Sequence, residues 1–285
     1  MTAPRNRILI VANLTKPNAE SIAKELYDVA LANGCSAEIT TTFPLESCAL
    51  AGKDLCIVIG GDGSILGVVG AVAETPVPVM GVNLGTLGFM ANYSPEGAIE
   101  ALKAFLKTPH PPSNRKLIKV TTAKGRTTWA LNDVVIRATG SRLARLTVRA
   151  DDNYLSAFYA DGLIFATPTG STAYSLSAGG PLLHPEARVL AMTPINPHSL
   201  TSRAMVLPEE VELTIELDPI TTDIQISTDG RRIEELESVF PIKVHICPNR
   251  YFPLLQPPNT SLYDLLRQKL RWMGEIPSRL QSDES

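Results

Sequence analysis

The sequence has few cysteines, little net charge and no long apolar segment. Its four cysteines, at positions 35, 48, 56 and 247, are scattered and form no C-x-x-C pair, which indicates reduced thiols in a cytoplasmic protein. The net charge of −3 argues against a nucleic-acid partner. No segment reaches the roughly 18 apolar residues of a membrane span, and the N-terminus shows no signal-peptide core, so no membrane partner is expected.

The 285 residues are enough for two domains of about 150 residues each. Up to residue 107, strand-like and helix-like segments alternate, which predicts an α/β domain with a parallel sheet over residues 1–107. Thr108 to Ser113 is proline-rich and predicts a boundary. Short strand-like runs then follow, so residues 115–256 should form a mostly β domain. Residues 257–285 should form a last helix, with an apolar face from Leu262 to Met273 that packs back on the first domain, and a polar tail.

One glycine-rich turn follows a strongly apolar segment of the N-terminal half. Leu55 to Ile59 are apolar without a break, which predicts a strand buried on both faces of a parallel sheet. Gly60-Gly61-Asp62-Gly63 comes next, and helical spacing begins after Ser64. The turn therefore lies at the carboxyl end of a strand, where open α/β sheets bind ligands.

Asp62 is the unusual residue of this turn. Glycine-rich turns before helices usually hold phosphate through backbone N–H groups, and a carboxylate repels phosphate. Asp62 can instead hold a metal that carries the phosphate, or accept a proton from an attacking hydroxyl group. Both interpretations indicate phosphoryl transfer. The alternative is a plain tight turn in which Asp62 caps the helix.

The densest polar segment of the chain is Thr167-Pro168-Thr169-Gly170-Ser171-Thr172-Ala173-Tyr174. Its hydroxyl and backbone N–H groups can line a nucleotide or sugar pocket, and Tyr174 can stack on a base. A serine- and threonine-rich connector is the alternative, although small residues continue to Gly180 where a solvent-exposed linker would carry more charge. A third polar segment, the pair Asn132-Asp133, interrupts the apolar run from Trp129 to Ile136. It marks either a strand break or a site.

Together these three segments resemble the NAD kinase family, whose members phosphorylate the 2′-hydroxyl of the adenosine ribose of NAD to give NADP. The resemblance covers roughly residues 5 to 273 and includes the second glycine-rich loop, Asn83 to Phe89. The Gly-Gly-Asp-Gly turn is shared with diacylglycerol and sphingosine kinases. The threonine-rich block and its link to Asn132-Asp133 are more specific.

The resemblance implies a fold and a set of site residues. The N-terminal α/β domain should be like that of phosphofructokinases, the C-terminal domain mostly β, and NAD should lie between them. Asp62 corresponds to the catalytic acid that takes the proton of the ribose hydroxyl, and Gly60, Gly61 and Gly63 are expected at the phosphates of ATP. The implied NAD-binding residues are Asp62, Gly63, Phe89, Asn132, Asp133, Arg142, Tyr159, Asp161, Thr169, Gly170, Ser171, Thr172, Ala173, Tyr174, Ser177 and Arg231.

The resemblance also implies substrates and an assembly. The phosphoryl donor is ATP or polyphosphate, accompanied by Mg²⁺, for which no side chain is assigned as a ligand. A homodimer or homotetramer is expected. Two positions depart from the family pattern. Asp133 stands where glutamate is frequent, and Arg231 stands where many members carry glutamine, so that the preference between NAD and NADH stays open.

Three other functions are compatible with parts of this pattern. A lipid kinase of the same superfold would need an apolar acceptor cleft and would leave Thr167 to Tyr174 unexplained. A non-catalytic nucleotide-binding regulator would not need Asp62 or Asn132-Asp133. A related enzyme could run toward NADP dephosphorylation, which an assay with NADP alone would reveal.

Overall fold

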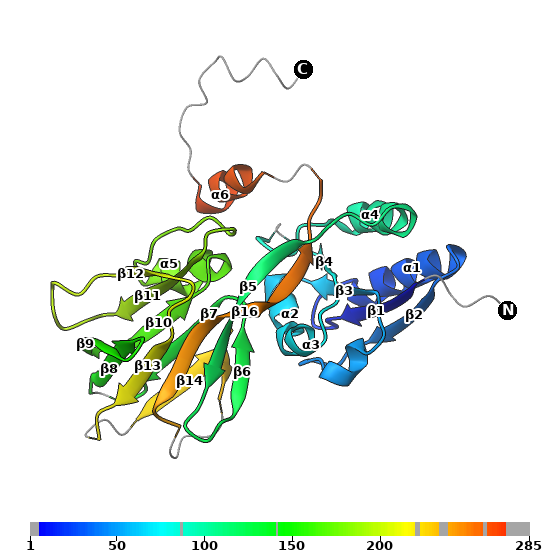
Figure 1. The fold of residues 1–285 in the computed structure, drawn as a ribbon. Coiled ribbons are helices and arrows are strands. Elements are labelled where there is room, and N and C mark those ends of the chain that lie inside the picture. Colours follow the sequence, from blue (N-terminus) through cyan, green and yellow to red (C-terminus); the bar gives the residue numbers. More distant parts are fainter. Residues whose placement is uncertain are drawn as a thin grey trace, which may run out of the picture.

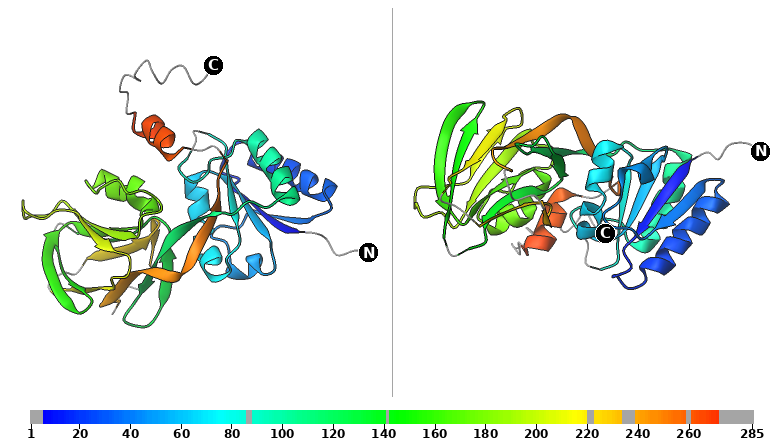
Figure 2. Two further views of the ribbon diagram at one scale, coloured as in Figure 1. Left: turned by 45° about the horizontal axis from the view of Figure 1, so that its top comes forward. Right: turned by 90° about the horizontal axis from the view of Figure 1, so that it is seen from below.

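The computed structural model describes residues 6–85, 88–140, 142–219, 223–233, 239–258 and 261–271. The chain forms an N-terminal α/β domain and a C-terminal β domain that lie side by side (Figures 1 and 2). Among these residues no helix is both long and apolar enough to cross a lipid bilayer. All four cysteines are free thiols.

The N-terminal domain contributes four parallel strands, in the order β2-β1-β3-β4. The strands are β1 (Arg7–Ala12), β2 (Ser36–Thr40), β3 (Leu55–Gly60) and β4 (Val79–Asn83). The helices are α1 (Ala19–Ala32), α2 (Asp62–Leu66), α3 (Val69–Glu74) and α4 (Pro95–Lys107), with a 3₁₀ turn η1 (Ser47–Leu50). The predicted parallel α/β domain is therefore confirmed.

Both faces of this sheet are covered, because successive strand residues point to opposite sides. On one face, Leu26 of α1 and Leu102 of α4 pack with Ile57 of β3. On the other face, Val72 of α3 packs with Val58 of β3. Every residue of β3 is buried, as the unbroken apolar run predicted.

The C-terminal domain consists of two sheets packed face to face. The first contains β5 (Ser113–Thr121), β6 (Thr127–Ala130), β8 (Ala144–Ala150), β9 (Asn153–Ala160), β13 (Leu213–Leu217) and β16 (Ile242–Leu255). The second contains β12 (Met205–Pro208), β11 (Val189–Ile195), β10 (Gly162–Ala166), β7 (Asp133–Ala138), β14 (Ile224–Thr228) and β15 (Arg231–Arg232), in this order. Between the sheets lies one apolar core that includes Val134, Phe165 and Val244. Short turns of helix, η2 (Thr169–Thr172) and α5 (Tyr174–Ser177), follow β10.

One long strand joins the two domains. The first residues of β16 pair antiparallel with β13, both halves of β16 pair antiparallel with β5, and its last residues, Leu254 and Leu255, pair parallel with β4. The sequence predicted a strand only over Ile242 to Ile246, because Pro248 and Pro253 obscured its continuation. Figure 1 shows β16 and β5 crossing from one domain to the other.

The last described helix is α6 (Leu262–Leu270), and the hydroxyl of Ser261 caps it by accepting from Asp264 N. Its apolar residues face a cavity shared with Phe89 of the N-terminal domain and with segments of the C-terminal domain. The strand β16 already returns to the N-terminal domain, and α6 follows it beside the cavity that Phe89 also lines. Met273 and the polar tail lie outside the described residues.

Candidate active site

Asp62 is the first residue of α2 and directly follows the end of β3. Its carboxylate crosses to the loop after β4, where Oδ2 accepts from Phe89 N at 2.8 Å. Oδ1 accepts from Met90 N at 3.0 Å and from Ala91 N at 2.8 Å. The carboxylate therefore binds a neighbouring loop and does not act as the helix cap of the alternative interpretation. We call this arrangement the Asp62 clasp.

A glycine makes room for this clasp. A Cβ atom on Gly88 would lie 2.1 Å from Asp62 Oδ1, which no side chain can accommodate without displacing the carboxylate. A carboxylate offers about four acceptor positions, and the clasp uses three of them. The open position is on Oδ2, which accepts one N–H group.

The three expected phosphate-binding glycines differ in their surroundings. A Cβ on Gly60 would lie 2.1 Å from Ser64 Oγ, so packing inside the protein already requires glycine there. Added Cβ atoms on Gly61 and Gly63 would meet nothing within 4 Å. Only these two glycines face space that a ligand can occupy.

Hydrogen bonds tie the threonine-rich block to the Asn132-Asp133 segment. Thr167 N donates to Asn132 O at 2.9 Å, and Thr167 Oγ1 donates to Leu131 O at 2.6 Å. A Cβ on Gly170 would lie 1.9 Å from Asn132 O, so the two backbones touch. The break between β6 and β7 at Leu131 and Asn132 is where this contact forms, so the predicted strand break also lies at the site.

Asp229 holds the same segment from the other side. It lies in the turn between β14 and β15 with a left-handed φ of 50°. Its Oδ2 accepts from Leu131 N at 2.8 Å, and its Oδ1 accepts from Asn132 N at 2.7 Å and Asp133 N at 3.2 Å. We call this the Asp229 clasp.

Asp133 and Asp229 form a buried acidic pair. Asp133 is 5% exposed. Burial, with the charge of Asp229 nearby, raises the pKa of Asp133 to about 7, against the effect of a hydrogen bond from the backbone of Tyr174. Burial also raises the pKa of Asp229 to about 6, although its three N–H partners and Arg231 favour the charged form. The pair therefore holds a proton at slightly acidic pH, and Asp133 is partly protonated near pH 7.

Three cavities surround these residues. The Tyr174 cavity, of about 390 Å³, is lined by Asn132, Asp133, Ala173 and Tyr174, among others. The Arg115 cavity, of about 570 Å³, is lined by Phe89, Thr169, Thr172, Arg115 and the apolar face of α6. The threonine-rich block thus lines both cavities: Thr169 and Thr172 line the Arg115 cavity, and Ala173 and Tyr174 line the Tyr174 cavity.

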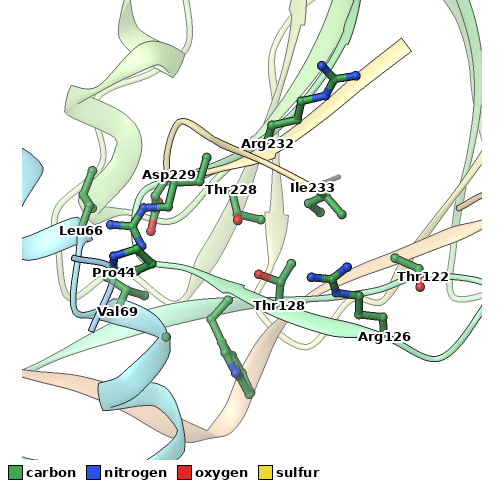
Figure 3. A pocket seen from close by; sticks show the side chains of 13 residues that line it. Pro44, Leu66, Val69, Thr122, Arg126, Thr128, Thr228, Asp229, Arg232 and Ile233 are labelled. Carbon is green, nitrogen blue, oxygen red and sulfur yellow. The ribbon is translucent and has the colours of Figure 1, made fainter. Parts of the chain in front are cut away.

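The third cavity, of about 300 Å³, is lined by Arg231 and by Leu66, Thr128 and Asp229, which Figure 3 shows. Leu66 and Asp229 also line the Tyr174 cavity, so the two hollows are neighbours. In Figure 3 Arg232 points away from the other labelled side chains.

Comparison with known proteins identifies this arrangement. Residues 40–110 match the family model of the ATP-NAD kinase N-terminal domain, and residues 131–254 match that of the ATP-NAD kinase C-terminal domain. An NAD kinase of Geotalea daltonii is 36% identical over 280 residues, covering 93% of this chain and 98% of that protein. This chain belongs to the NAD kinase family.

Further relatives agree with the assignment to the NAD kinase family. An NAD kinase of Nitrosomonas europaea is 36% identical over 264 residues, covering 90% of this chain and 88% of that protein. Yeast NADH kinase, solved in complex with NADH, shares the fold with a TM-score of 0.85 at 23% identity, over 96% of this chain and 90% of the yeast chain. An Archaeoglobus fulgidus NAD kinase in complex with ATP gives a TM-score of 0.76 at 21% identity, over 94% of this chain and all of that one. The predicted family and fold are confirmed.

The structure brings many of the site residues implied by the NAD kinase family into two groups. Asn132, Asp133, Ala173 and Tyr174 share the Tyr174 cavity. Phe89, Thr169 and Thr172 share the Arg115 cavity. Ser177 is exposed on α5, whereas Ser171 is fully buried and bonds Pro168 O and Leu183 N, so its hydroxyl serves the loop itself.

Three implied residues lie elsewhere in the chain. Asp161 precedes β10 and Thr167 follows it, and the six residue-to-residue steps from Asp161 to Thr167 along the strand span about 20 Å. Asp161 accepts from Asn196 Nδ2, and the ring of the exposed Tyr159 lies under Arg145. Arg142 is exposed. Within one chain, these residues are at the opposite end of β10 from Tyr174.

Sequence reasoning missed Asp229 and Arg115. Asp229 belongs to Ser227-Thr228-Asp229-Gly230, which directly precedes Arg231. An acid before glycine at the end of a strand-like run repeats the Asp62 pattern, which was the available signal. Arg115 gave no signal, because an arginine at the start of a strand is usually solvent-exposed.

Proposed function

We propose that this enzyme transfers the terminal phosphoryl group of ATP to the 2′-hydroxyl of the adenosine ribose of NAD, giving NADP, and that Asp62 accepts the hydroxyl proton. The observation that carries the proposal is the fixed carboxylate of Asp62, with an acceptor position open on Oδ2 beside Gly61 and Gly63. Chemistry at this position requires an oriented acid, and the hydrogen bonds that orient the Asp62 carboxylate support this role.

The proposed step balances simply. The ribose O–H bond breaks and its proton goes to Asp62, while the oxygen bonds the γ-phosphorus and the bond from that phosphorus to the ADP oxygen breaks. A ribose hydroxyl has a pKa far above 7, so a positioned base helps. In-line positioning of the two substrates should contribute more than the base does.

We propose that NAD lies against the Asn132-Asp133 segment, where the Asp229 clasp fixes the backbone. Asp133 can accept a hydrogen bond from a ribose hydroxyl when it is ionised. Tyr174, 39% exposed in the neighbouring cavity, offers a ring face for a base.

Mg²⁺ is proposed to enter with the phosphates of the donor and to neutralise their charge. Among the described residues, no group of three or more His, Cys, Asp and Glu side chains could hold a metal ion. Mg²⁺ in nucleotide sites is generally bound by substrate phosphates and water, with one or two carboxylates from the protein. Asp62 is the carboxylate that stands in the glycine turn.

We also propose a cytoplasmic homodimer or homotetramer, on the resemblance to the NAD kinase family. Light scattering after size-exclusion chromatography measures the oligomeric state directly.

The decisive experiment is an NADP-formation assay that offers ATP or inorganic polyphosphate as donor and NAD or NADH as acceptor. NADP formation from ATP and NAD is expected, dependent on Mg²⁺. Absence of NADP with every donor, together with phosphorylation of diacylglycerol, would overturn the proposal in favour of a lipid kinase. Release of phosphate from NADP alone would show that the site catalyses NADP dephosphorylation.

A further inference from the structure

The Arg115 cavity contains a buried positive charge that no described residue pairs with directly. Arg115 lies on β5, is only 6% exposed and lines the cavity. Its Nε is buried without a hydrogen-bond partner. Among the described residues no carboxylate forms an ion pair with it; the exposed Glu186 lines the same cavity, and its charge favours the protonated form of Arg115.

Such a group needs an explanation, because buried charges in proteins are normally paired. Removing a guanidinium from water without a partner costs several kcal/mol. Arginine cannot relieve this by losing its proton under ordinary conditions. Burial lowers the pKa of Arg115, because removal from water disfavours the charged form of the guanidinium. An anion from outside the chain would remove this cost.

A second unpaired polar atom lies on the same cavity. Thr169 is 8% exposed, and its Oγ1 is buried with no hydrogen-bond partner. The neighbouring Thr172 hydroxyl is already used by the loop, since it donates to Thr169 O. The Arg115 guanidinium and the Thr169 hydroxyl can both donate to an oxyanion, in a cavity that Glu186 and His184 also line.

The cavity also adjoins the turn formed by Gly60 to Gly63, through Phe89. Phe89 donates its backbone N–H to Asp62 Oδ2, and its side chain lines the cavity. The turn itself contains no lysine or arginine, so nearby positive charge must come from another segment.

We propose that Arg115 binds a phosphate group of a nucleotide substrate in this cavity, with the Thr169 hydroxyl as a second donor. The proposal rests on the proposed function and adds a phosphate-binding residue outside the glycine turn. A planar guanidinium can bind two phosphate oxygens at once. The phosphate can belong to the triphosphate of ATP or to the diphosphate of NAD, and kinetics separates these sources.

The first experiment measures substrate dependence in R115Q. Loss of a charge-assisted hydrogen bond is expected to raise one KM, for ATP or for NAD, by about tenfold to a hundredfold, with a smaller change in kcat. A raised KM for ATP identifies the donor, and a raised KM for NAD identifies the acceptor. R115K keeps the positive charge but not the two-pronged guanidinium, so its KM should lie between those of the wild type and R115Q.

The matched control is K116Q, which removes a charge from the next residue of β5. Lys116 pairs with Glu209 at 2.6 Å, so both KM values should stay within about twofold of the wild type. Glu186→Gln tests the alternative of a purely structural Arg115–Glu186 attraction. If R115Q and E186Q lower the melting temperature alike and leave both KM values unchanged, the proposal is wrong.

A second measurement avoids turnover altogether. Inorganic tripolyphosphate should raise the melting temperature of the wild type and of K116Q, and raise that of R115Q much less. Equal shifts in all three proteins would contradict the proposal. If R115Q does not fold, R115K is measured in both experiments, with a severalfold rise in one KM expected and unchanged constants counting against the idea. A wild type that forms no NADP refutes the proposed function, whereas an active wild type with an unaffected R115Q refutes only this inference.

Discussion

Each domain contains an aspartate whose carboxylate accepts three backbone hydrogen bonds from a distant segment, but the two aspartates have different surroundings. In the N-terminal domain, Asp62 accepts hydrogen bonds from the backbone N–H groups of residues 89 to 91. In the C-terminal domain, Asp229 accepts them from residues 131 to 133. Each acid precedes a glycine, and each grips three successive amides of a segment distant in sequence.

The surroundings of the two clasps differ. Asp62 stands beside Gly61 and Gly63, where an added Cβ would meet open space. Asp229 stands beside a second acid, Asp133, whose N–H it holds and whose charge it opposes. The comparison indicates that a clasped carboxylate becomes chemically available only where its neighbours leave room. The C-terminal clasp instead fixes the backbone of residues 131 to 133, where we propose that NAD binds.

The strongest test replaces each clasp acid by its amide. Asparagine accepts with only one of its two side-chain atoms, so D62N and D229N both weaken a three-amide clasp. Only D62N removes the proposed base, and we expect kcat for NADP formation to fall by about 10²- to 10⁴-fold. D229N should lower kcat by no more than about tenfold while raising the KM for NAD.

The measurement is steady-state kinetics, supported by calorimetric NAD binding without a donor. Equal losses of kcat in D62N and D229N would mean that the clasp, and not the proton transfer, carries the effect of Asp62.

A smaller effect is expected from the glycines around Asp62. Gly88→Ala puts a methyl group 2.1 Å from Oδ1 and must displace the carboxylate, costing about 1–3 kcal/mol of unfolding free energy. Gly61→Ala meets no protein atom and should change stability by less than about 1 kcal/mol. Urea denaturation measures both. If G61A keeps full stability but raises the KM for ATP, the open space beside Gly61 holds the donor.

The smallest effect concerns protons at the C-terminal clasp. An aspartate titrates near pH 4 in an unfolded chain, whereas burial raises the pKa of Asp133 to about 7. Between these values the folded state holds the extra proton, so the unfolding free energy falls as pH rises from about 4 to 7. Asp229, with its pKa raised to about 6, acts in the same direction.

Asp133→Asn removes this dependence at one site. The melting temperature of the wild type should therefore decline more steeply than that of D133N between pH 4 and 7. Parallel curves would show that the buried pair does not retain its proton on folding.

Local sequence patterns predicted most of the N-terminal domain. The unbroken apolar run ending in Gly60 and the cap at Ser94, which accepts from Gly97 N at 3.1 Å, are both read within a few residues. Asn18 precedes α1 and is of a residue type that favours helix N-caps, but its side chain makes no capping hydrogen bond and it has a left-handed φ of 63°. Helical spacing begins after Ser64, but the structure has two short helices, α2 and α3, with Gly67 and Val68 between them and Gly67 close to the ring of Phe43.

Contacts between distant segments could not be predicted in this way. The Asp229 clasp joins residues 98 positions apart, and nothing local to Ser227-Thr228-Asp229 indicates its partner. The family resemblance compensated for this at Asn132 and Tyr174, but it gave no place to Arg115, whose burial results from the meeting of β5, α6 and the loop at Glu186.

The shared strand β16 limits how the enzyme can be taken apart or flexed. Because Leu254 and Leu255 extend the sheet beside β4 while Ile242 and Val244 belong to the other domain's sheet, neither half is a detachable module. A fragment ending at residue 107 would expose an open edge at β4. We expect any rotation of one domain against the other to bend the shared strand where the pairing of β16 with β5 loses register, between Ile246 and Tyr251. The domains are joined by a continuous sheet and not by a flexible linker.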